Sequence, residues 1–312
     1  MTDELTESMQ RHRRELHVHC YRMLGSFEEA EDVVQEVFLR AWRSRDTYAG
    51  RASLRAWLYR IATNACLDVL RRETRRGSTK VADMPWISPY PDQLLDELAP
   101  PDAEPDAQLI AKETIELAFL AAIQVLPPRQ RAVVILRDVL GWSAAETASF
   151  IDGTVAAVNS ALQRARAALQ HQWPGGRLDA APAAEPSETE RRLLQSYIEA
   201  HERADADRLI ELLRDDVRLS ITALGTWDGR ETVAAGLKEG MNSLGAWRVL
   251  PVRANRQPAA AGYLRRWGDD TFRAFAITLL QVVDGGLKEM AAFERPDLFP
   301  LFGLPAVLED PA

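Results

Sequence analysis

Arginine and aromatic side chains alternate between residues 38 and 76, a combination that can bind a nucleic acid. Residues 40–80 contain eleven Lys and Arg against three acids, whereas residues 81–110 contain seven acids and no base. Arginines neutralise phosphates without reading sequence, and aromatic side chains hold the unstacked bases of a single strand. The whole chain carries a net charge of −8, so the basic segment is a local feature that indicates a polyanionic partner.

A second segment, residues 141–169, has the pattern of a helix-turn-helix. Ser143 and Glu146 have the S-x-x-E spacing of a capping box, which predicts that a helix starts there. The Asp-Gly pair at 152–153 interrupts that helix, and Thr154 can cap a second one. In a helix-turn-helix the second helix enters the major groove of DNA.

That second helix has an unusual charge distribution, because residues 155–163 contain no Lys or Arg. Asn and Gln can still read base edges, and Asn159 can pair with adenine. Anchoring on phosphates is then expected from the amides at the start of the helix and from arginines outside its first three turns: Arg129, Arg131, Arg164 and Arg166.

The periodicity of apolar residues divides the chain into three folded parts and two linkers. One linker holds six prolines and seven acids and is predicted to be unfolded. The last part begins with a helix pair, continues with short alternating runs, and has a hairpin signal at Asp284-Gly285-Gly286. The predicted boundaries are helical domain 1–80, acidic linker 81–107, helical domain 108–172, linker 173–186 and α+β domain 187–312.

The composition of the 312 residues excludes several classes of protein. No apolar run is long enough to cross a bilayer, and the N-terminus lacks a signal-peptide core. Two distant cysteines, Cys20 and Cys66, indicate a reducing, cytosolic location. His17 and His19 lie two residues apart on a predicted helix and point apart, so no metal site is expected. No nucleotide-binding or nucleophile motif appears, and no cofactor is expected.

The predicted helix over residues 32–43 has two distinct faces. Six apolar side chains fill one half of the wheel and form a core stripe: Val33, Val34, Val37, Phe38, Ala41 and Trp42. The other half holds Asp32, Gln35, Glu36, Leu39 and Arg43. A single exposed leucine is ordinary, but a leucine ringed by polar groups is also typical of a small protein–protein contact. The wheel leaves both interpretations open.

These motifs carry a resemblance to a known family. AEDVVQEVFLRAW (residues 30–42), followed by LRAWLYRIATNACLDVLRR, resembles region 2 of the extracytoplasmic-function (ECF) sigma factors of the sigma-70 family. LPPRQRAVVILRDVLGWSAAETASFI and LQRARAAL resemble region 4, so the resemblance spans roughly residues 8–172. The recognition helix departs from the family's usual V-K-S-R-L, with Asn159 and Ala161 at the two basic positions.

The resemblance implies RNA polymerase core and promoter DNA as partners, with contacts to the β′ clamp helices and the β flap. The clamp-binding face is implied to be Asp32, Gln35, Glu36, Leu39 and Arg43. The implied −10 contacts are Arg51, Ser53, Arg55, Arg60, Asn64, Arg71 and Arg72. The implied −35 contacts are Thr154, Val155, Ala157, Asn159, Ser160, Gln163, Arg164 and Arg166.

Residues 187–312 resemble a SnoaL-like domain of the NTF2-like superfamily, which implies a cone-shaped α+β barrel that regulates the sigma core in cis. A pocket for a small apolar ligand is expected among Trp247, Tyr263, Trp267, Phe275 and Phe293, although barrel core would explain the same residues; a protein regulator is the other expected partner. The acids lie in turn-like contexts and His201 lies on a polar stretch of the first helix, so the domain is not expected to be an enzyme.

Three functions follow from this pattern. The first is an ECF sigma factor that gives RNA polymerase its promoter specificity, with no membrane partner. The second is a stand-alone helix-turn-helix regulator that acts without polymerase. The third is a SnoaL-type isomerase or cyclase tethered to a DNA-binding region. Leu39 among acids favours the first function over the second. No Asp or Glu on a predicted strand is clearly expected to point into the barrel, which disfavours the third.

Overall fold

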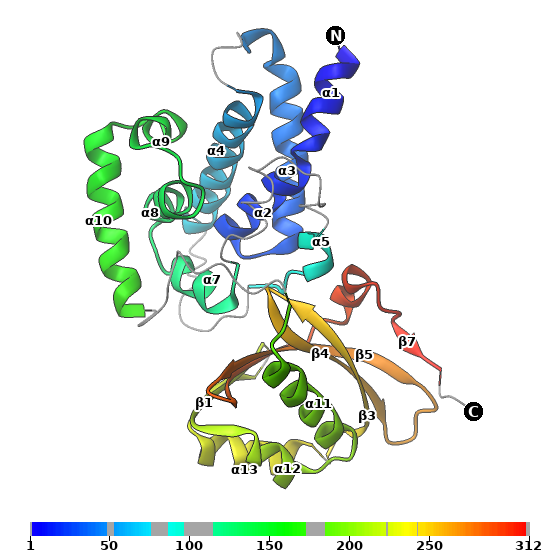
Figure 1. The fold of residues 1–312 in the computed structure, drawn as a ribbon. Helices are drawn as coiled ribbons and strands as arrows, with labels where there is room; N and C mark the ends of the chain where they lie inside the picture. The colour runs from blue at the N-terminus through cyan, green and yellow to red at the C-terminus, as the bar shows by residue number, and fades with distance from the viewer. Residues whose placement is uncertain are drawn as a thin grey trace. The chain divides into compact units, whose positions relative to one another are not determined.

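A computed structural model describes residues 2–48, 53–75, 87–96, 115–172, 185–222, 224–241 and 243–309, which fall into two structural units (Figure 1). The first unit takes in residues 1–81, 86–88 and 96–182, and the second takes in residues 82–85, 89–95 and 183–312. Both predicted helical domains contribute to the first unit, and the predicted α+β domain forms most of the second.

The first half of the helical unit is built from α1 (Thr2–Arg11), α2 (Arg13–Leu24), α3 (Phe27–Arg43), a 3-10 turn η1 (Arg45–Thr47) and α4 (Leu54–Arg75). The predicted break at residues 25–26 is confirmed. Gly25 ends α2 with a left-handed φ of 80°, and Ser26 accepts a hydrogen bond from the Glu29 amide to start α3. Glycine adopts this conformation without a Cβ clash, which makes it a common helix terminator.

The second half contains α7 (Leu117–Gln124), α8 (Pro128–Val134), a π-helical turn η2 (Ile135–Val139), α9 (Ala144–Phe150) and α10 (Val155–Gln172). The predicted capping box is present, because Ser143 and Glu146 satisfy each other's backbone amides. Asp152 turns the chain with a φ of 48°, and the Thr154 hydroxyl accepts from the Ala157 amide at 3.2 Å. The helix-turn-helix therefore forms from local signals.

The predicted acidic linker is wrong as an unfolded element over its described residues, 87–96. Tyr90 is 3% exposed and exchanges hydrogen bonds with Asn255, the first residue of the β3–β4 turn. The Asp92 carboxylate accepts from the Arg256 amide at 2.7 Å and lies 3.2 Å from the Arg253 guanidinium. Residues 89–95 therefore belong to the second unit, and Asp92, the first residue of the short helix α5 (Asp92–Asp96), binds the β3–β4 turn.

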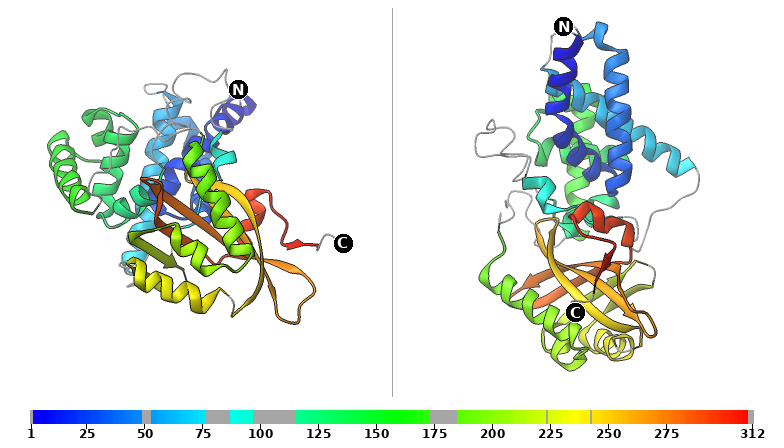
Figure 2. Two further views of the ribbon diagram at one scale, coloured as in Figure 1. Left: turned by 60° about the horizontal axis from the view of Figure 1, so that its bottom comes forward. Right: turned by 90° about the vertical axis from the view of Figure 1, so that its right-hand side faces the viewer.

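The second unit is a curved sheet with three α-helices, within residues 188–240, on one side, and the 3-10 helix at residues 296–302 lies apart from them (Figures 1 and 2). Its strands lie in the order β2-β1-β6-β5-β4-β3, and β7 pairs with β5. The hairpin predicted at residues 284–286 is confirmed between β5 and β6. The strands are β1 (Leu213–Ile221), β2 (Gly225–Asp228), β3 (Gly245–Ala254), β4 (Gln257–Arg266), β5 (Phe272–Val283), β6 (Gly286–Phe293) and β7 (Val307–Leu308).

The unit is the α+β cone expected of a SnoaL-like domain, with one difference. The strands β2 and β3 end the sheet without pairing to each other, so the cone is open rather than a closed barrel. The predicted helix pair is confirmed as α11 and α12, whereas α13, β2 and the 3-10 helix η3 had no clear sequence signal. The helices are α11 (Glu188–Glu202), α12 (Ala206–Glu211), α13 (Arg230–Gly240) and η3 (Pro296–Phe302).

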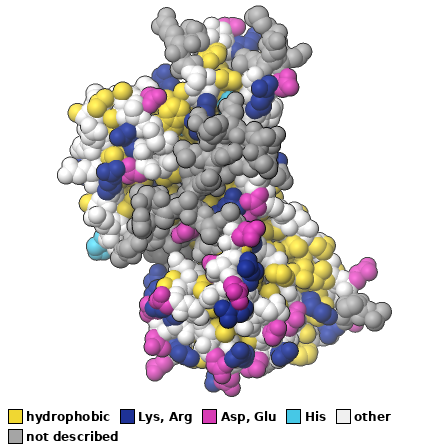
Figure 3. All heavy atoms as spheres, viewed as in Figure 1, with side chains coloured by type: hydrophobic (Ala, Val, Ile, Leu, Met, Phe, Trp, Pro, Cys, Tyr) yellow, Lys and Arg dark blue, Asp and Glu magenta, His cyan; other side chains and the backbone are white. Residues whose placement is uncertain are grey.

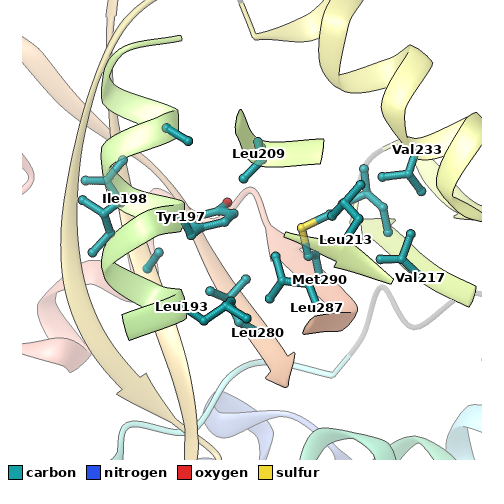
Figure 4. Close-up of a cluster of buried hydrophobic side chains, with 14 of the residues drawn as sticks. Leu193, Tyr197, Ile198, Leu209, Leu213, Val217, Val233, Leu280, Leu287 and Met290 are labelled. Atoms are coloured by element: carbon teal, nitrogen blue, oxygen red, sulfur yellow. The ribbon is translucent and has the colours of Figure 1, made fainter. Parts of the chain in front are cut away.

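The core of this unit lies between the helices and the concave face of the sheet. Figure 4 shows Tyr197 projecting from α11 toward Leu209 and Met290. Leu193 and Tyr197 are buried one helical turn apart, and the same i, i+4 spacing brings residue 201 to this face.

Candidate nucleic-acid, protein and ligand sites

The mixed face of α3 is open to solvent. Leu39 is 51% exposed, and Asp32, Gln35 and Arg43 are exposed around it without hydrogen bonds or ion pairs inside the described residues. Glu36 pairs with Arg40 at 2.8 Å, and Arg40 reaches Asp68 of α4 at 3.1 Å. The five predicted residues therefore present an apolar side chain ringed by charge, as a small protein contact requires.

The opposite face of α3 is largely buried, as predicted, but Phe38 is only half-buried. Val33, Val34, Val37 and Ala41 are buried. The prediction was wrong for Trp42, which is 37% exposed and carries the Arg45 guanidinium over its ring, 4.7 Å from the centroid. Trp42 is the last residue but one of α3, which ends at Arg43.

Two predicted −10 contacts lie against the helix-turn-helix. Arg60 Nη2 donates to Asp152 Oδ1 at 3.0 Å. Asn64 Nδ2 donates to the Phe150 carbonyl at 2.8 Å. Phe150 ends α9 and Asp152 lies in the turn that follows, so in this arrangement one face of α4 is covered by the helix-turn-helix.

Arg55 is also held inside the helical unit. Its Nε donates to Glu15 at 2.9 Å, and its guanidinium lies over Tyr59 and Trp142, 5.1 and 5.2 Å from the ring centroids. Burial alone would raise the pKa of Glu15, but hydrogen bonds from His12 and Arg55 lower it overall. The ion pair at Arg55 therefore ties α2 to α4.

The remaining −10 predictions divide into exposed, capping and undescribed positions. Arg71 is exposed beside Asp68 at 3.2 Å, and Arg72 is exposed. Ser53 caps α4 by accepting from the Ala56 amide at 3.1 Å. Arg51 lies outside the described residues.

All eight predicted −35 residues lie on the solvent side of α10. They are Thr154, Val155, Ala157, Asn159, Ser160, Gln163, Arg164 and Arg166. Val158 and Leu162 point inward and hold the helix on its neighbours. Arg166 donates two hydrogen bonds to Asp138, at 2.8 and 2.6 Å, which reduces the cationic charge of an already weakly basic face.

The prediction that Arg131 anchors DNA phosphates was wrong. Arg131 is 5% exposed, and its guanidinium donates to the carbonyls of Met23, Ile123 and Gln124 at 2.5 to 3.1 Å. Burial lowers its pKa to about 10. Because the carbonyls that accept these hydrogen bonds lie in the last turns of α2 and α7, Arg131 joins the two halves of the helical unit.

The second unit contains a cavity of about 270 Å³ between α11, α13 and the sheet. Trp247 and Phe275 line it as predicted, with their rings edge to face at 5.3 Å. Leu224 and Leu244 are exposed at its rim. The walls are mainly apolar, and Glu294 is the one carboxylate among the described residues that line it.

Three of the five predicted pocket residues do not line this cavity. Ala260 and Gly262 face it, so strand alternation turns Tyr263 to the other side, where it packs on Phe299 at 5.0 Å. Phe293 likewise alternates with lining residues. Trp267 follows the end of β4 and is 73% exposed.

His201 is the functional candidate that the sequence argument missed. It lines the cavity, stacked on Tyr197 at 5.3 Å and edge to face with Trp247 at 5.1 Å. Burial lowers the pKa of His201 to about 4 and raises the pKa of Tyr197 to about 12. The spacing 193, 197, 201 continues the apolar stripe of α11 and could have revealed it.

Other classes of site find no support in the part of the chain that the structure describes. No group of three or more His, Cys, Asp or Glu is placed to hold a metal there. None of the helices in these ranges is both long and apolar enough to span a bilayer. On the face in Figure 3, acidic and basic side chains are interspersed over the second unit, unlike the single-sign patch that a DNA-binding surface shows.

Comparison with known family models and sequences supports the resemblance to the ECF sigma factors. Residues 9–76 match the family model for Sigma-70 region 2, and residues 116–169 match the model for Sigma-70, region 4. The chain is 40% identical to the ECF RNA polymerase sigma factor SigG of Mycobacterium tuberculosis, over 94% of this chain and 82% of that one. It is 33% identical to SigW of Bacillus subtilis, over 49% of this chain and 80% of that one.

A solved structure covers both units. The crystal structure of the M. tuberculosis ECF sigma factor SigJ aligns with a TM-score of 0.63 over 96% of this chain and 98% of that one, at 21% identity, which shows the shared fold. The two sigma-region matches, in order along the chain, and the 40% identity to SigG over 94% of this chain lead to one conclusion. The chain belongs to the ECF RNA polymerase sigma factors.

Proposed function

We propose that the α3 face docks on the β′ clamp helices of RNA polymerase and that α4 and α10 contact the −10 and −35 promoter elements. The observation that carries this proposal is the α3 face, where Leu39 is 51% exposed and Asp32, Gln35 and Arg43 make no hydrogen bond or ion pair within the described residues. A monomeric DNA-binding regulator has no need of such a face. As a polymerase subunit, the protein would work in the cytoplasm.

The contribution of Leu39 can be worked out from its exposure. Full burial of a leucine contributes about 1.5–3 kcal/mol, and half of the side chain is still exposed, so docking gains about 1 kcal/mol. Aspartate at this position would bury an unpaired charge at a cost of about 1–3 kcal/mol. Leu39→Asp with Asp32→Arg should therefore weaken core binding on the order of a hundredfold.

The test is a titration of core polymerase with the labelled full chain. Val125→Asp is the matched control, since Val125 is 48% exposed in the same unit but lies outside the α3 face. The double variant should lose core binding with unchanged thermal unfolding, while Val125→Asp keeps it. Equal core affinity for wild type and double variant would move the polymerase contact elsewhere.

Promoter engagement requires α4 to be uncovered. Arg60 and Asn64 are bonded to the helix-turn-helix, so the same side chains cannot bind a base or phosphate until that contact opens. We infer that docking on polymerase separates the two halves of the helical unit, because the polymerase holds the −10 and −35 contacts apart on one promoter. Tethering also supports the weakly basic α10 by effective concentration.

The second unit is proposed to modulate the sigma core in cis, as a binding module rather than an enzyme. Its cavity supports binding, because apolar walls with few polar groups are typical of small-molecule sites. Run-off transcription by the full chain and by a chain ending at Gln172 measures the direction of control. Equal activity of the two chains with every template would contradict modulation in cis.

A further inference from the structure

The cavity in the second unit exists because small residues line it. Glycine or alanine occupies positions where a larger side chain would fill the space: Gly236, Gly240, Ala260, Gly262, Ala276 and Ala292. A Cβ added at Gly236 or Gly240 of α13 meets no atom within 4 Å. Glycine lowers helix stability by about 1 kcal/mol relative to alanine. These two glycines therefore leave the cavity open although they make α13 less stable.

The volume sets the size of the ligand. A cavity of about 150 Å³ admits one benzene ring, and pockets for drug-sized ligands begin near about 300 Å³. The 270 Å³ measured here therefore suits a molecule of about two fused rings.

The polar groups determine the charge of the ligand. No Lys or Arg occurs among the described residues that line the cavity. His201 is neutral at physiological pH because burial lowers its pKa to about 4. Desolvation raises the pKa of Glu294. When ionised, the Glu294 carboxylate would repel an anion. A carboxylate or phosphate ligand would find no partner, so the walls favour a neutral molecule.

The histidine ring also indicates which polar atom the ligand should carry. His201 Nδ1 is buried without a hydrogen-bond partner. Nε2 makes no hydrogen bond within the described residues, so it is the ring nitrogen left for a molecule in the cavity that His201 lines. A buried N–H without an acceptor is rarer than an unpaired acceptor. The proton therefore belongs on Nε2, where it can be donated to a ligand oxygen.

We propose that this cavity binds a neutral, two-ring-sized apolar molecule whose oxygen accepts a hydrogen bond from His201 Nε2. The inference rests on the proposed role of the second unit as a binding module and adds the chemistry of the ligand. Tyr197 and Trp247 hold the imidazole between their rings, which fixes the direction of the donor. The apolar rim at Leu224 and Leu244 provides an entry for such a molecule.

Three probes of equal size test the proposal by equilibrium dialysis against the full chain: 2-acetylnaphthalene, 2-isopropylnaphthalene and 2-naphthoate. The first has an acceptor oxygen, the second has none, and the third is an anion. The two neutral probes should bind, and naphthoate should bind at least about tenfold more weakly than the ketone. Naphthoate binding as tightly as the ketone would overturn the inference of a neutral ligand.

His201→Phe isolates the hydrogen bond, because phenylalanine keeps the ring contacts. The readout is the affinity of the ketone divided by that of the hydrocarbon, a ratio in which the hydrophobic contribution cancels. The variant should lower this ratio about three- to tenfold, the size of one net hydrogen bond. An unchanged ratio with both probes still bound would overturn the role of His201 but leave the binding module intact.

Gly236→Leu fills the cavity from α13 and should remove binding of both neutral probes while the chain stays folded. Ala235→Leu is the matched control, because Ala235 is exposed on the same helix and does not line the cavity. Ala235→Leu should bind as wild type does. If neither neutral probe binds to the wild-type chain, the binding-module role itself fails, and the ligand chemistry fails with it.

Discussion

Replacing Arg131 with methionine separates a structural arginine from a DNA-binding one. The side chain lies between the ends of α2 and α7 and donates five hydrogen bonds, four of them to main-chain carbonyls and one to the Gln124 side chain. Methionine fills a similar volume but donates nothing. The carbonyls of Met23, Ile123 and Gln124 would then lose their partners inside the protein.

The loss of unfolding free energy in Arg131→Met is the difference between two opposing effects. Each buried carbonyl left without a donor costs about 1–3 kcal/mol, so the gross loss is on the order of 3–9 kcal/mol. Relief from burying the charge offsets part of this, because the pKa of Arg131 is lowered from 12.5 to about 10, equivalent to about 3 kcal/mol. A net loss of about 3 kcal/mol is expected, which lowers Tm by about 6–12 °C.

The assay is thermal and urea unfolding of the full chain, followed by DNA binding at several salt concentrations. Arg164→Met is the matched control, since Arg164 is exposed on α10 and, within the described residues, donates to Ser160 alone. Arg131→Met should lower Tm, whereas Arg164→Met should leave Tm unchanged and reduce the salt dependence of binding. An unchanged Tm with a reduced salt slope for Arg131→Met would refute the structural role.

Two further predictions concern the helical unit. Burial lowers the pKa of His19 from 6.5 to about 3, so between these two pH values only the unfolded chain takes up the proton. The free energy of unfolding is therefore highest above pH 6.5 and decreases as the pH falls, by about 2 kcal/mol from pH 7.5 to pH 5. Urea titrations should show that loss, and His19→Leu should reduce it; identical pH profiles would contradict the assignment. Asp152→Asn removes the ion pair to Arg60, which contributes about 0.2–1 kcal/mol. The variant should bind −10 single strands about 1.5- to fivefold more tightly in a fluorescence titration. Weaker binding would show that the contact between Asp152 and Arg60 does not compete with DNA.

Features set by neighbouring residues in the sequence could be predicted. The capping box at Ser143, the turn at Asp152 and the hairpin after β5 depend on side chains within a few positions, so the sequence specifies them locally. The mixed face of α3 follows from helical periodicity, which placed Leu39 correctly among its polar neighbours.

Features set by distant contacts could not be predicted. The cavity-facing phase of the strands depends on bulges, such as the register shift between Gly262 and Tyr263, and one residue of shift reverses which side chains face inward. Arg131 reads as a surface cation because its acceptors lie up to 108 positions away. The segment around Asp92 reads as a linker because its partners are in a turn 164 residues later.

The central claim is that this chain directs RNA polymerase to promoters through the α3 face. Run-off transcription with purified core polymerase tests it most directly, with a promoter library that includes the gene's own upstream region as template. The wild-type chain should yield transcripts with discrete start sites, and the Asp32→Arg, Leu39→Asp variant should need a concentration on the order of a hundredfold higher to yield them. Promoter DNA binding by the chain alone, with no transcripts and no binding to core polymerase, would contradict the claim and favour a stand-alone regulator.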